Sequence, residues 1–429
     1  MSNINDLPDD LLVKILSYIP TKDVVGTCLL SKRWESLWTH VTRLEYDQEH
    51  HYARRTGFSR FVDKSLLSHQ ASLLESLHFK LKSGYAYRDI GLWIRTAINR
   101  RIRELTLECS EILIHLPSRL FTCETLVILK LKGWIDLNIP LTASLPSLKT
   151  LHIVLLRKSN YESFSRLLSN CPVLDDLMVE QRRSNDMSKL NVSVPSLQRL
   201  SIRTVIESEN GLSYFIDDKN IPKVEINAPS LKYLNIDDDR GNDFDVINKD
   251  LHQVVEARIK ANETSTKDFL RYLTSSVKSL SLSSLKLEDV YPTGSFFIQL
   301  VHLEICTSTN GWLKLLANML EGSLKLRVLK LFYVREHSNW WMPSFDRWDP
   351  PSSVPSCMVS SLETLEWRGY LGREIEFELM IYLLKHSLCL KTAIVTSNEF
   401  KGAEEMYQMV EVPAPVPVGS KICKLVFDV

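Results

Sequence analysis

Apolar residues near the N-terminus follow the spacing of an amphipathic helix. From Leu7 to Ile19 they recur at helical intervals and occupy one broad face. Pro20 ends this helix, since proline lacks the backbone N–H that a helix interior needs. Thr21 and Ser31 can each cap a further short helix. The pattern therefore predicts three short helices within about the first forty residues.

From residue 74 a different pattern recurs. An aliphatic residue is followed three positions later by a second one, usually leucine, and two positions after that by a bulky residue. Most of these units begin 22 to 28 residues apart, which is the period and pattern of leucine-rich repeats. Each unit predicts one short strand, whose apolar side is covered only when a neighbouring unit stacks on it. The twelve units begin at Leu74, Ile102, Leu126, Leu148, Leu174, Leu197, Leu231, Val254, Val277, Leu300, Leu326 and Leu362.

The repeated units predict the fold class. Stacked units of this kind form an α/β solenoid, so we expect an irregular horseshoe of repeats after the N-terminal helices. The intervals that follow Leu197 and Leu326 are longer than the others, and they predict two inserted loops.

Alternation along each strand predicts which side chains point away from the repeat core. These side chains are mostly charged, with both signs present, which suits a folded protein partner better than a nucleic-acid backbone. For any single residue among them, a solvated strand face is the alternative to a binding contact. The candidate substrate-binding residues are Lys130, His152, Arg203, Arg258, Lys260, Glu304, Lys330, Phe332, Glu366 and Arg368.

Composition and charge exclude several classes of protein. Lys and Arg number 52, as do Asp and Glu, so no net charge draws the whole chain to nucleic acid or anionic lipid. The 14 glycines are never spaced as in dinucleotide-binding, P-loop or serine-hydrolase motifs. We therefore expect a non-catalytic protein that has no cofactor and binds neither nucleic acid nor membranes.

The cysteines and the N-terminus predict where the protein resides. The eight cysteines are scattered, with the closest pair 14 residues apart, so they provide no C-x-x-C motif and no compact disulfide framework. We expect no metal site and a reducing compartment. The N-terminus lacks a secretory signal, and no apolar run is long enough to span a bilayer. These features predict a cytoplasmic location, a nuclear one, or both.

The N-terminal helices resemble a known motif. The segment from Leu7 to Val25, together with Leu29–Trp34 and with Leu37 and Trp38, resembles an F-box of the plant type. In F-box proteins this unit docks on a Skp-type adaptor, which links it to a cullin-RING ubiquitin ligase. By this resemblance the adaptor-binding residues would be Leu7, Pro8, Leu11, Ile15, Leu16, Ile19, Val24, Leu30, Lys32, Trp34 and Trp38.

The C-terminal part resembles the FBD domain of the same plant family. Residues 334–361 interrupt the repeats with prolines and with four aromatic residues, namely Trp340, Trp341, Phe345 and Trp348. The order F-box, repeats, FBD matches that family across nearly the whole chain, and we expect the FBD region to cap the solenoid. The implied domains are an F-box over residues 1–45, leucine-rich repeats over 46–333, and an FBD domain with terminal repeats over 334–429.

The resemblance implies a role in protein recruitment. We expect a substrate-recognition subunit of a Skp-cullin-F-box E3 ubiquitin ligase complex, which recruits a target protein through the repeat surface for ubiquitination. Two alternatives remain open. One is a small-molecule or hormone co-receptor of the F-box type, in which a ligand completes the target site. The other is an adaptor-bound scaffold that acts outside a ligase.

Overall fold

The computed structural model divides the chain into two compact units. The first comprises Met1–Gln198, Arg203–Ile216 and Glu225–Ala228, and the second comprises Arg199–Ile202, Asp217–Val224 and Pro229–Val429. The structure describes residues 4–49, 55–82, 87–156, 161–182, 189–205, 223–238, 242–249, 251–283, 287, 290–292, 294, 296–334, 348–397 and 418–428.

The first unit begins with three short α-helices, α1 (Asp9–Leu16), α2 (Thr21–Gly26) and α3 (Lys32–Leu37). Three 3-10 helices flank them, at Ile4–Asp6, Thr27–Leu29 and Trp38–His40. Ser31 is the N-cap residue of α3, as predicted, although its side chain makes no capping hydrogen bond. The prediction for Thr21 was wrong, because Pro20 is the N-cap residue of α2 and the Thr21 hydroxyl instead accepts a hydrogen bond from the Glu45 N–H at 2.8 Å.

The remainder of the first unit is a parallel sheet whose strands alternate with helices or loops. Strands β1 to β6 are hydrogen-bonded in chain order. The elements of this part of the chain, of which β7 lies outside the parallel sheet, are β1 (Arg43–Asp47), α4 (Arg55–Ser68), β2 (Ser76–Leu81), α5 (Tyr87–Asn99), β3 (Glu104–His115), a 3-10 helix (Ser118–Thr122), β4 (Ile128–Asp136), β5 (Thr150–Leu156), α6 (Tyr161–Ser169), β6 (Asp176–Arg182) and β7 (Leu190–Ser193).

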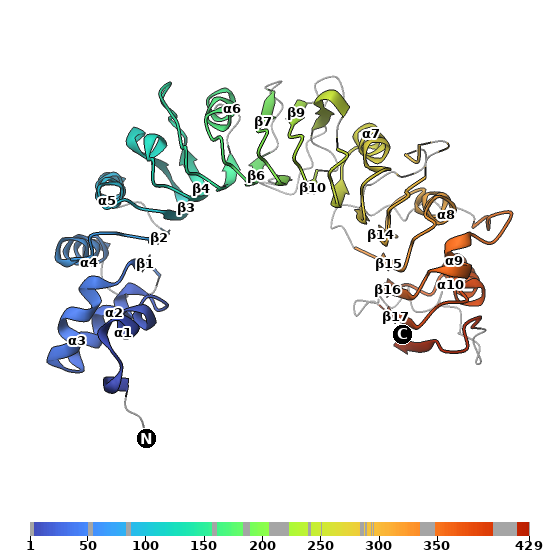
Figure 1. Cartoon of the computed structure of the whole chain (residues 1–429), viewed down its shortest axis with the longest axis horizontal. Coiled ribbons are helices and arrows are strands. Elements are labelled where there is room, and N and C mark those ends of the chain that lie inside the picture. The colour runs from blue at the N-terminus through green and yellow to red at the C-terminus, as the bar shows by residue number, and fades with distance from the viewer. Residues whose placement is uncertain are drawn as a thin grey trace. The chain divides into compact units, whose positions relative to one another are not determined.

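The second unit repeats this arrangement. Strands β10 and β12 to β18 form a parallel sheet in which each strand pairs with the next one in that order, and Figure 1 shows α8 and α10 on one side of these strands. The elements of the second unit, of which β11 lies outside the parallel sheet, are β10 (Tyr233–Asp237), β11 (Asp243–Val246), a 3-10 helix (Ile247–Lys249), β12 (Glu256–Lys260), α7 (Glu263–Leu273), β13 (Ser279–Leu282), β14 (His302–Cys306), α8 (Trp312–Gly322), β15 (Val328–Phe332), α9 (Ser356–Ser360), β16 (Thr364–Tyr370), α10 (Glu374–His386), β17 (Thr392–Ser397) and β18 (Lys424–Asp428). Strands β8 (Arg199–Val205) and β9 (Lys223–Asn227) contain residues of both units.

Each of the twelve predicted units coincides with one strand, so this part of the prediction is confirmed. Among the units that begin at residues 74 to 174 and among those that begin at residues 231 to 362, the second aliphatic residue lies in register with that of the next unit, as in the column formed by Leu77, Leu105 and Leu129. These side chains are completely buried. A parallel ladder of this kind aligns equivalent positions, so one repeated leucine builds a continuous apolar layer. The mixed α/β fold with a parallel sheet is that of a leucine-rich-repeat region.

The structure also contains repeat strands that the sequence pattern had not identified. Strand β1 continues the ladder on the N-terminal side, with Leu44 in register with Leu77. Strands β17 and β18 continue it beyond the last predicted unit, with Ala393 in register with Leu365. The two predicted loops include residues 206–222 and 335–347, which lie outside the described residues, as do Trp340, Trp341 and Phe345.

Trp348, the remaining aromatic residue of the predicted FBD region, is buried. Its ring lies 5.6 Å from the ring of Tyr382 on α10, in an edge-on arrangement. It therefore belongs to the apolar core of the second unit. Within the described residues, no helix combines the length and the apolar character needed to cross a membrane.

Candidate interaction surfaces

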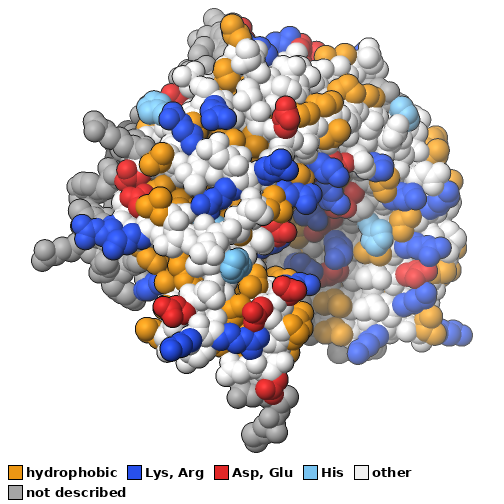
Figure 2. All heavy atoms as spheres, turned by 60° about the vertical axis from the view of Figure 1, so that its left-hand side comes forward, with side chains coloured by type: hydrophobic (Ala, Val, Ile, Leu, Met, Phe, Trp, Pro, Cys, Tyr) orange, Lys and Arg blue, Asp and Glu red, His pale blue; other side chains and the backbone are white. Residues whose placement is uncertain are grey.

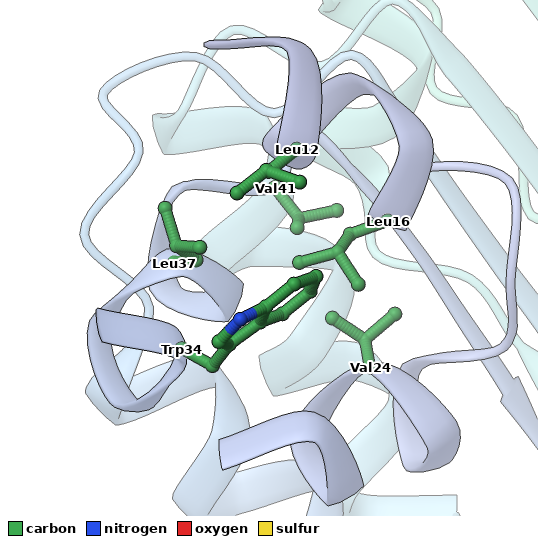
Figure 3. Packing of buried hydrophobic residues seen from close by; sticks show 6 residues of the cluster. All are labelled: Leu12, Leu16, Val24, Trp34, Leu37 and Val41. Atoms are coloured by element: carbon green, nitrogen blue, oxygen red, sulfur yellow. The ribbon is translucent and has the colours of Figure 1, made fainter. Parts of the chain in front are cut away.

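The N-terminal helices enclose a small core. Side chains of α1, α2, α3 and the segment that follows them converge, as Figure 3 shows, and this core consists of Leu12, Leu16, Val24, Trp34, Leu37 and Val41. The Trp34 indole N–H also donates a hydrogen bond of 2.9 Å to Oδ1 of Asn5, so its polar atom is satisfied inside the unit. The core is therefore closed without any contribution from a partner.

Three of the predicted adaptor contacts belong to this core. Leu16, Val24 and Trp34 are at most 4% exposed, so a partner that docks on the folded unit cannot reach them. The prediction is corrected for these three residues, which support the surface from below. Helical spacing alone did not reveal this, because α1 carries apolar residues on two adjacent faces.

The outward face of α1 is apolar as well. Leu11 and Ile15 are 47% and 45% exposed, whereas their neighbours Leu12 and Leu16 are buried. The exposed large apolar residues between positions 4 and 30 are Ile4, Leu11, Ile15, Tyr18, Ile19, Leu29 and Leu30. Exposed apolar groups concentrated in so short a segment are typical of a protein-binding surface.

The predicted contacts did not include three of these residues, Ile4, Tyr18 and Leu29. Tyr18 stands seven residues after Leu11 and three after Ile15, the spacing of one helical face, so periodicity could have identified it. Leu29 is 88% exposed, and no periodic signal marks it, because it ends a 3-10 helix. Of the predicted contacts, Pro8, Leu30 and Lys32 are exposed, and Leu7 and Trp38 are partly exposed.

Trp38 also lines an open cavity of about 350 Å³. Val25 of α2 and Phe61 of α4 line the same cavity, as do Arg60 and Lys64, which stand one turn apart on α4. This cavity combines apolar walls with two cationic side chains.

Arg33 fastens the N-terminal segment to α3. Its guanidinium donates hydrogen bonds to Oδ1 of Asp9, to the Leu7 carbonyl at 2.5 Å and to the Asn5 carbonyl. A planar guanidinium with five N–H donors suits several acceptors at once. Arg33 was absent from the predicted site, and its role is to hold Leu7 and Pro8 in place.

Hydrogen bonds connect the N-terminal helices to the first repeat. Nε2 of the buried His69 donates to the Val41 carbonyl at 2.6 Å, and Nδ1 accepts from Arg100 at 2.6 Å. Burial lowers the pKa of His69, which is consistent with a neutral ring in this arrangement. The Gln70 N–H also donates to the Thr39 carbonyl at 2.8 Å. The helices and the first repeat are thus joined through several backbone groups.

In the first unit, the outward face of the strands carries paired charges. Lys130 of β4 and His152 of β5 are in register, and His152 lies 3.4 Å from Asp176. Arg203 of β8 lies 3.7 Å from Glu180 of β6. Adjacent strands thus place opposite charges side by side, which favours the parallel register.

In the second unit, the other seven candidates lie on four strands. Arg258 and Lys260 are on β12, Glu304 on β14, Lys330 and Phe332 on β15, and Glu366 and Arg368 on β16. All seven side chains are exposed or partly exposed. Figure 2, in which the side that carries the N-terminal elements comes forward, shows positive, negative and hydrophobic side chains interspersed on the face in view. The structure leaves these candidates accessible to a partner.

Glu366 lies at the centre of a three-residue ion network in the second unit. Its Oε2 lies 3.0 Å from Nζ of Lys330, and its Oε1 accepts from Nε of Arg368 at 2.5 Å. Burial opposes ionisation of this carboxyl, but the hydrogen bonds from the two cations more than offset it and lower its pKa. Glu366 is therefore a carboxylate that holds two cationic side chains in position.

The described residues contain no group of three or more His, Cys, Asp or Glu side chains that could hold a metal ion. Burial raises the pKa of Cys109 and of Cys357 to about 11, so both thiols are poor nucleophiles at neutral pH.

A helical unit with an exposed apolar face, followed by parallel repeat strands, defines a leucine-rich-repeat protein of the F-box class. Comparisons with known protein families agree. The model described as F-box domain matches residues 4–46, the one described as "FBD-associated F-box protein At5g56370, LRR repeats" matches residues 90–226, and the FBD model matches residues 349–395.

Relatives place the chain in one family. It is 41% identical to F-box/FBD/LRR-repeat protein At4g26340 of Arabidopsis thaliana, with 100% of each chain covered. It is 38% identical to F-box/FBD/LRR-repeat protein At5g56420 of the same plant, over 99% of this chain and 98% of the relative. The chain therefore belongs to the plant F-box/FBD/LRR-repeat family, which supports a general substrate-recognition role of the F-box type.

Proposed function

We propose that this protein is the substrate-recognition subunit of a Skp-cullin-F-box ubiquitin ligase. The observation that carries the proposal is the exposed apolar face of the N-terminal helices above a core that is already complete. Leu11, Ile15 and Leu29 contribute nothing to that core, so their exposure has no role in folding. An adaptor of the Skp type that covers these side chains gives the exposure a function.

In this proposal the repeat strands bind the target protein. Inward leucines keep the sheet stable, so outward residues such as Arg258 and Lys330 are free to vary with the target. The hydrogen bonds of His69 and Gln70 join the adaptor-binding helices to the first repeat. The protein itself is non-catalytic and raises the effective concentration of the target near a charged ubiquitin carrier.

Three further features belong to the proposal. The repeats curve into an irregular horseshoe, the FBD region caps its C-terminal end, and the protein works in the cytoplasm, the nucleus or both. The cap prediction has its own test in the Discussion.

The decisive experiment is reconstitution. Purified full-length chain, mixed with a plant Skp-type adaptor, should give a complex of one copy each in size-exclusion chromatography with light scattering. Addition of a cullin with its RING subunit should shift this complex to a larger mass. Failure to bind the adaptor would contradict the proposed function. Adaptor binding without cullin would favour a scaffold outside a ligase.

A further inference from the structure

Arg368 is held by one edge of its guanidinium and presents the other edge to solvent. Its Nε bonds to Glu366, while its side chain remains 64% exposed. Among the described residues, Arg368 forms an ion pair with Glu366 alone, and it does so through Nε. Glu366 is only 16% exposed, and Lys330 pairs with its second oxygen. The carboxylate thus orients Arg368 without occupying the forked end that binds anions.

The neighbours of Arg368 add apolar and hydroxyl groups. In the parallel register, Phe332 of β15 stands beside Arg368 on one side and Thr396 of β17 on the other. Ile394 stands beside Glu366. All three side chains are partly exposed, and adjacent strands lie about 4.8 Å apart, so one extended ligand segment can contact several of them together.

The local charge favours an anion. Lys330, Arg368 and Glu366 together carry one net positive charge. Two further carboxylate residues lie near on the sheet: Asp428 of β18 is in register with Thr396, and Glu304 is in register with Lys330. Asp428 is two strands from Arg368, about 10 Å between backbones, and Glu304 is about 12 Å away, so both separations exceed the screening length of about 8 Å in physiological salt. Separations of this size weaken the repulsion that either carboxylate exerts on an anion bound by Arg368.

We propose that Arg368 binds an acidic side chain of the target protein, with Phe332 and Ile394 contacting a hydrophobic residue beside it. The occupant is an extended target segment in which an anionic residue, either a carboxylate or a phosphorylated serine, adjoins an aliphatic or aromatic one. This inference rests on the proposed function, because it names the chemistry of the target. It adds Thr396 and Ile394 to the target-binding residues.

Arg271 provides a matched control. It is 52% exposed and pairs at 3.2 Å with Asp268, three residues before it, so it too is an exposed arginine beside a carboxylate. It lies on α7, however, and not on a repeat strand. Removal of either arginine changes the net charge of the protein equally. Only the loss of Arg368 should affect recognition of an acidic residue beside a hydrophobic one.

The test uses the full-length chain and fluorescein-labelled peptides of nine residues, glycine and serine except for a central pair. The pairs are glutamate–leucine, phosphoserine–leucine, glutamine–leucine and glutamate–serine. Fluorescence anisotropy should give a dissociation constant roughly tenfold to a hundredfold lower for glutamate–leucine than for glutamine–leucine, the range expected for a charge-assisted hydrogen bond. Glutamate–serine should bind more weakly than glutamate–leucine. Tighter binding of phosphoserine–leucine than of glutamate–leucine would assign the site to a phosphorylated target, and the reverse order to an unmodified acidic one.

Variants decide whether Arg368 is responsible. Arg368→Gln should abolish the preference for glutamate over glutamine, Arg368→Lys should retain part of it, and Arg271→Gln should retain all of it. A wild-type protein without this preference, or an Arg368→Gln variant that keeps it, would overturn the proposal. Adaptor binding is measured separately on the same variants and should not change, so a failure of the proposed function is distinguishable from a failure of this site.

Discussion

The adaptor-binding surface is most directly tested by placing charges on it. Replacing Leu11 and Ile15 together by aspartate puts two carboxylates on the exposed face of α1. Both native side chains are about half exposed, so in the free protein the new carboxylates reach water. The cost to folding should be small, at about 1–2 kcal/mol, from weaker helix propensity and from a negative charge near the C-terminus of α1.

The cost to adaptor binding should be much larger. Each substitution removes the burial of about half an apolar side chain, worth roughly 1 kcal/mol, and leaves an unpaired carboxylate in an apolar interface, at several kcal/mol. For both sites the sum exceeds about 5 kcal/mol. Since every 1.4 kcal/mol is tenfold, adaptor affinity should fall by roughly a thousandfold or more.

The assay is the titration of a labelled Skp-type adaptor with wild type and variant, with thermal denaturation run on both. Leu67→Asp with Leu92→Asp is the matched control, because both leucines are well exposed but lie on α4 and α5, outside the N-terminal helices. The control should bind the adaptor like wild type. Adaptor affinity that is unchanged in the Leu11 and Ile15 variant, with the fold intact, would refute the assignment of this surface.

Three further predictions follow from the same contacts. Trp34→Ala should lower the free energy of unfolding of the N-terminal helices by about 3–5 kcal/mol, measurable by denaturant titration, because it empties their core; a change below about 1 kcal/mol would contradict the packing in Figure 3. The pKa of His69 is lowered in the folded protein, so as pH falls below the ordinary value of 6.5 the unfolded state binds a proton before the folded state does. The free energy of unfolding should therefore be highest above pH 6.5 and should fall as pH drops through the lowered pKa. Denaturant titrations between pH 7 and 5 should show this loss in wild type and a smaller one in His69→Gln. Ending the chain after residue 333 removes β16 and leaves the edge of β15 unpaired, so size-exclusion chromatography should show aggregation of the truncated protein. A monodisperse product would instead make the FBD region a separate interaction domain.

The repeat strands were predictable because the same physical requirement recurs in every unit. A strand that stacks between two neighbours buries alternate side chains, and a leucine at the second position, as at Leu105 or Leu329, satisfies this each time. Alanine at this position weakens the signal: Ala257 stands in a regular run of units and was identified, whereas Ala393 of β17 follows the irregular FBD segment and was not. Val41, Leu44 and Tyr46 also follow the pattern, but they lie at the end of the segment assigned to the F-box.

The exposed apolar surface of the N-terminal helices was predictable only in part. Periodicity identifies apolar positions, but on α1 both the inward face of Leu12 and the outward face of Leu11 are apolar. Burial depends on where α2 and α3 pack, and this is a property of the folded unit. The ion pair between Arg368 and Glu366 also depends on the folded structure, since two residues of opposite charge at i and i+2 pair only when they stand on one face of a strand.

Inward and outward positions of each strand have different roles, and this difference determines how target recognition can change. The inward positions of β15 and β16, such as Leu329 and Leu365, are completely buried, so substitutions there cost several kcal/mol. The outward positions contribute little to stability, because exposed ion pairs are worth less than about 1 kcal/mol. Replacement of Arg368 or Phe332 can therefore alter which target binds without unfolding the protein. Under the proposed function, a family built on one repeat scaffold can acquire different targets through such residues while its N-terminal helices stay the same.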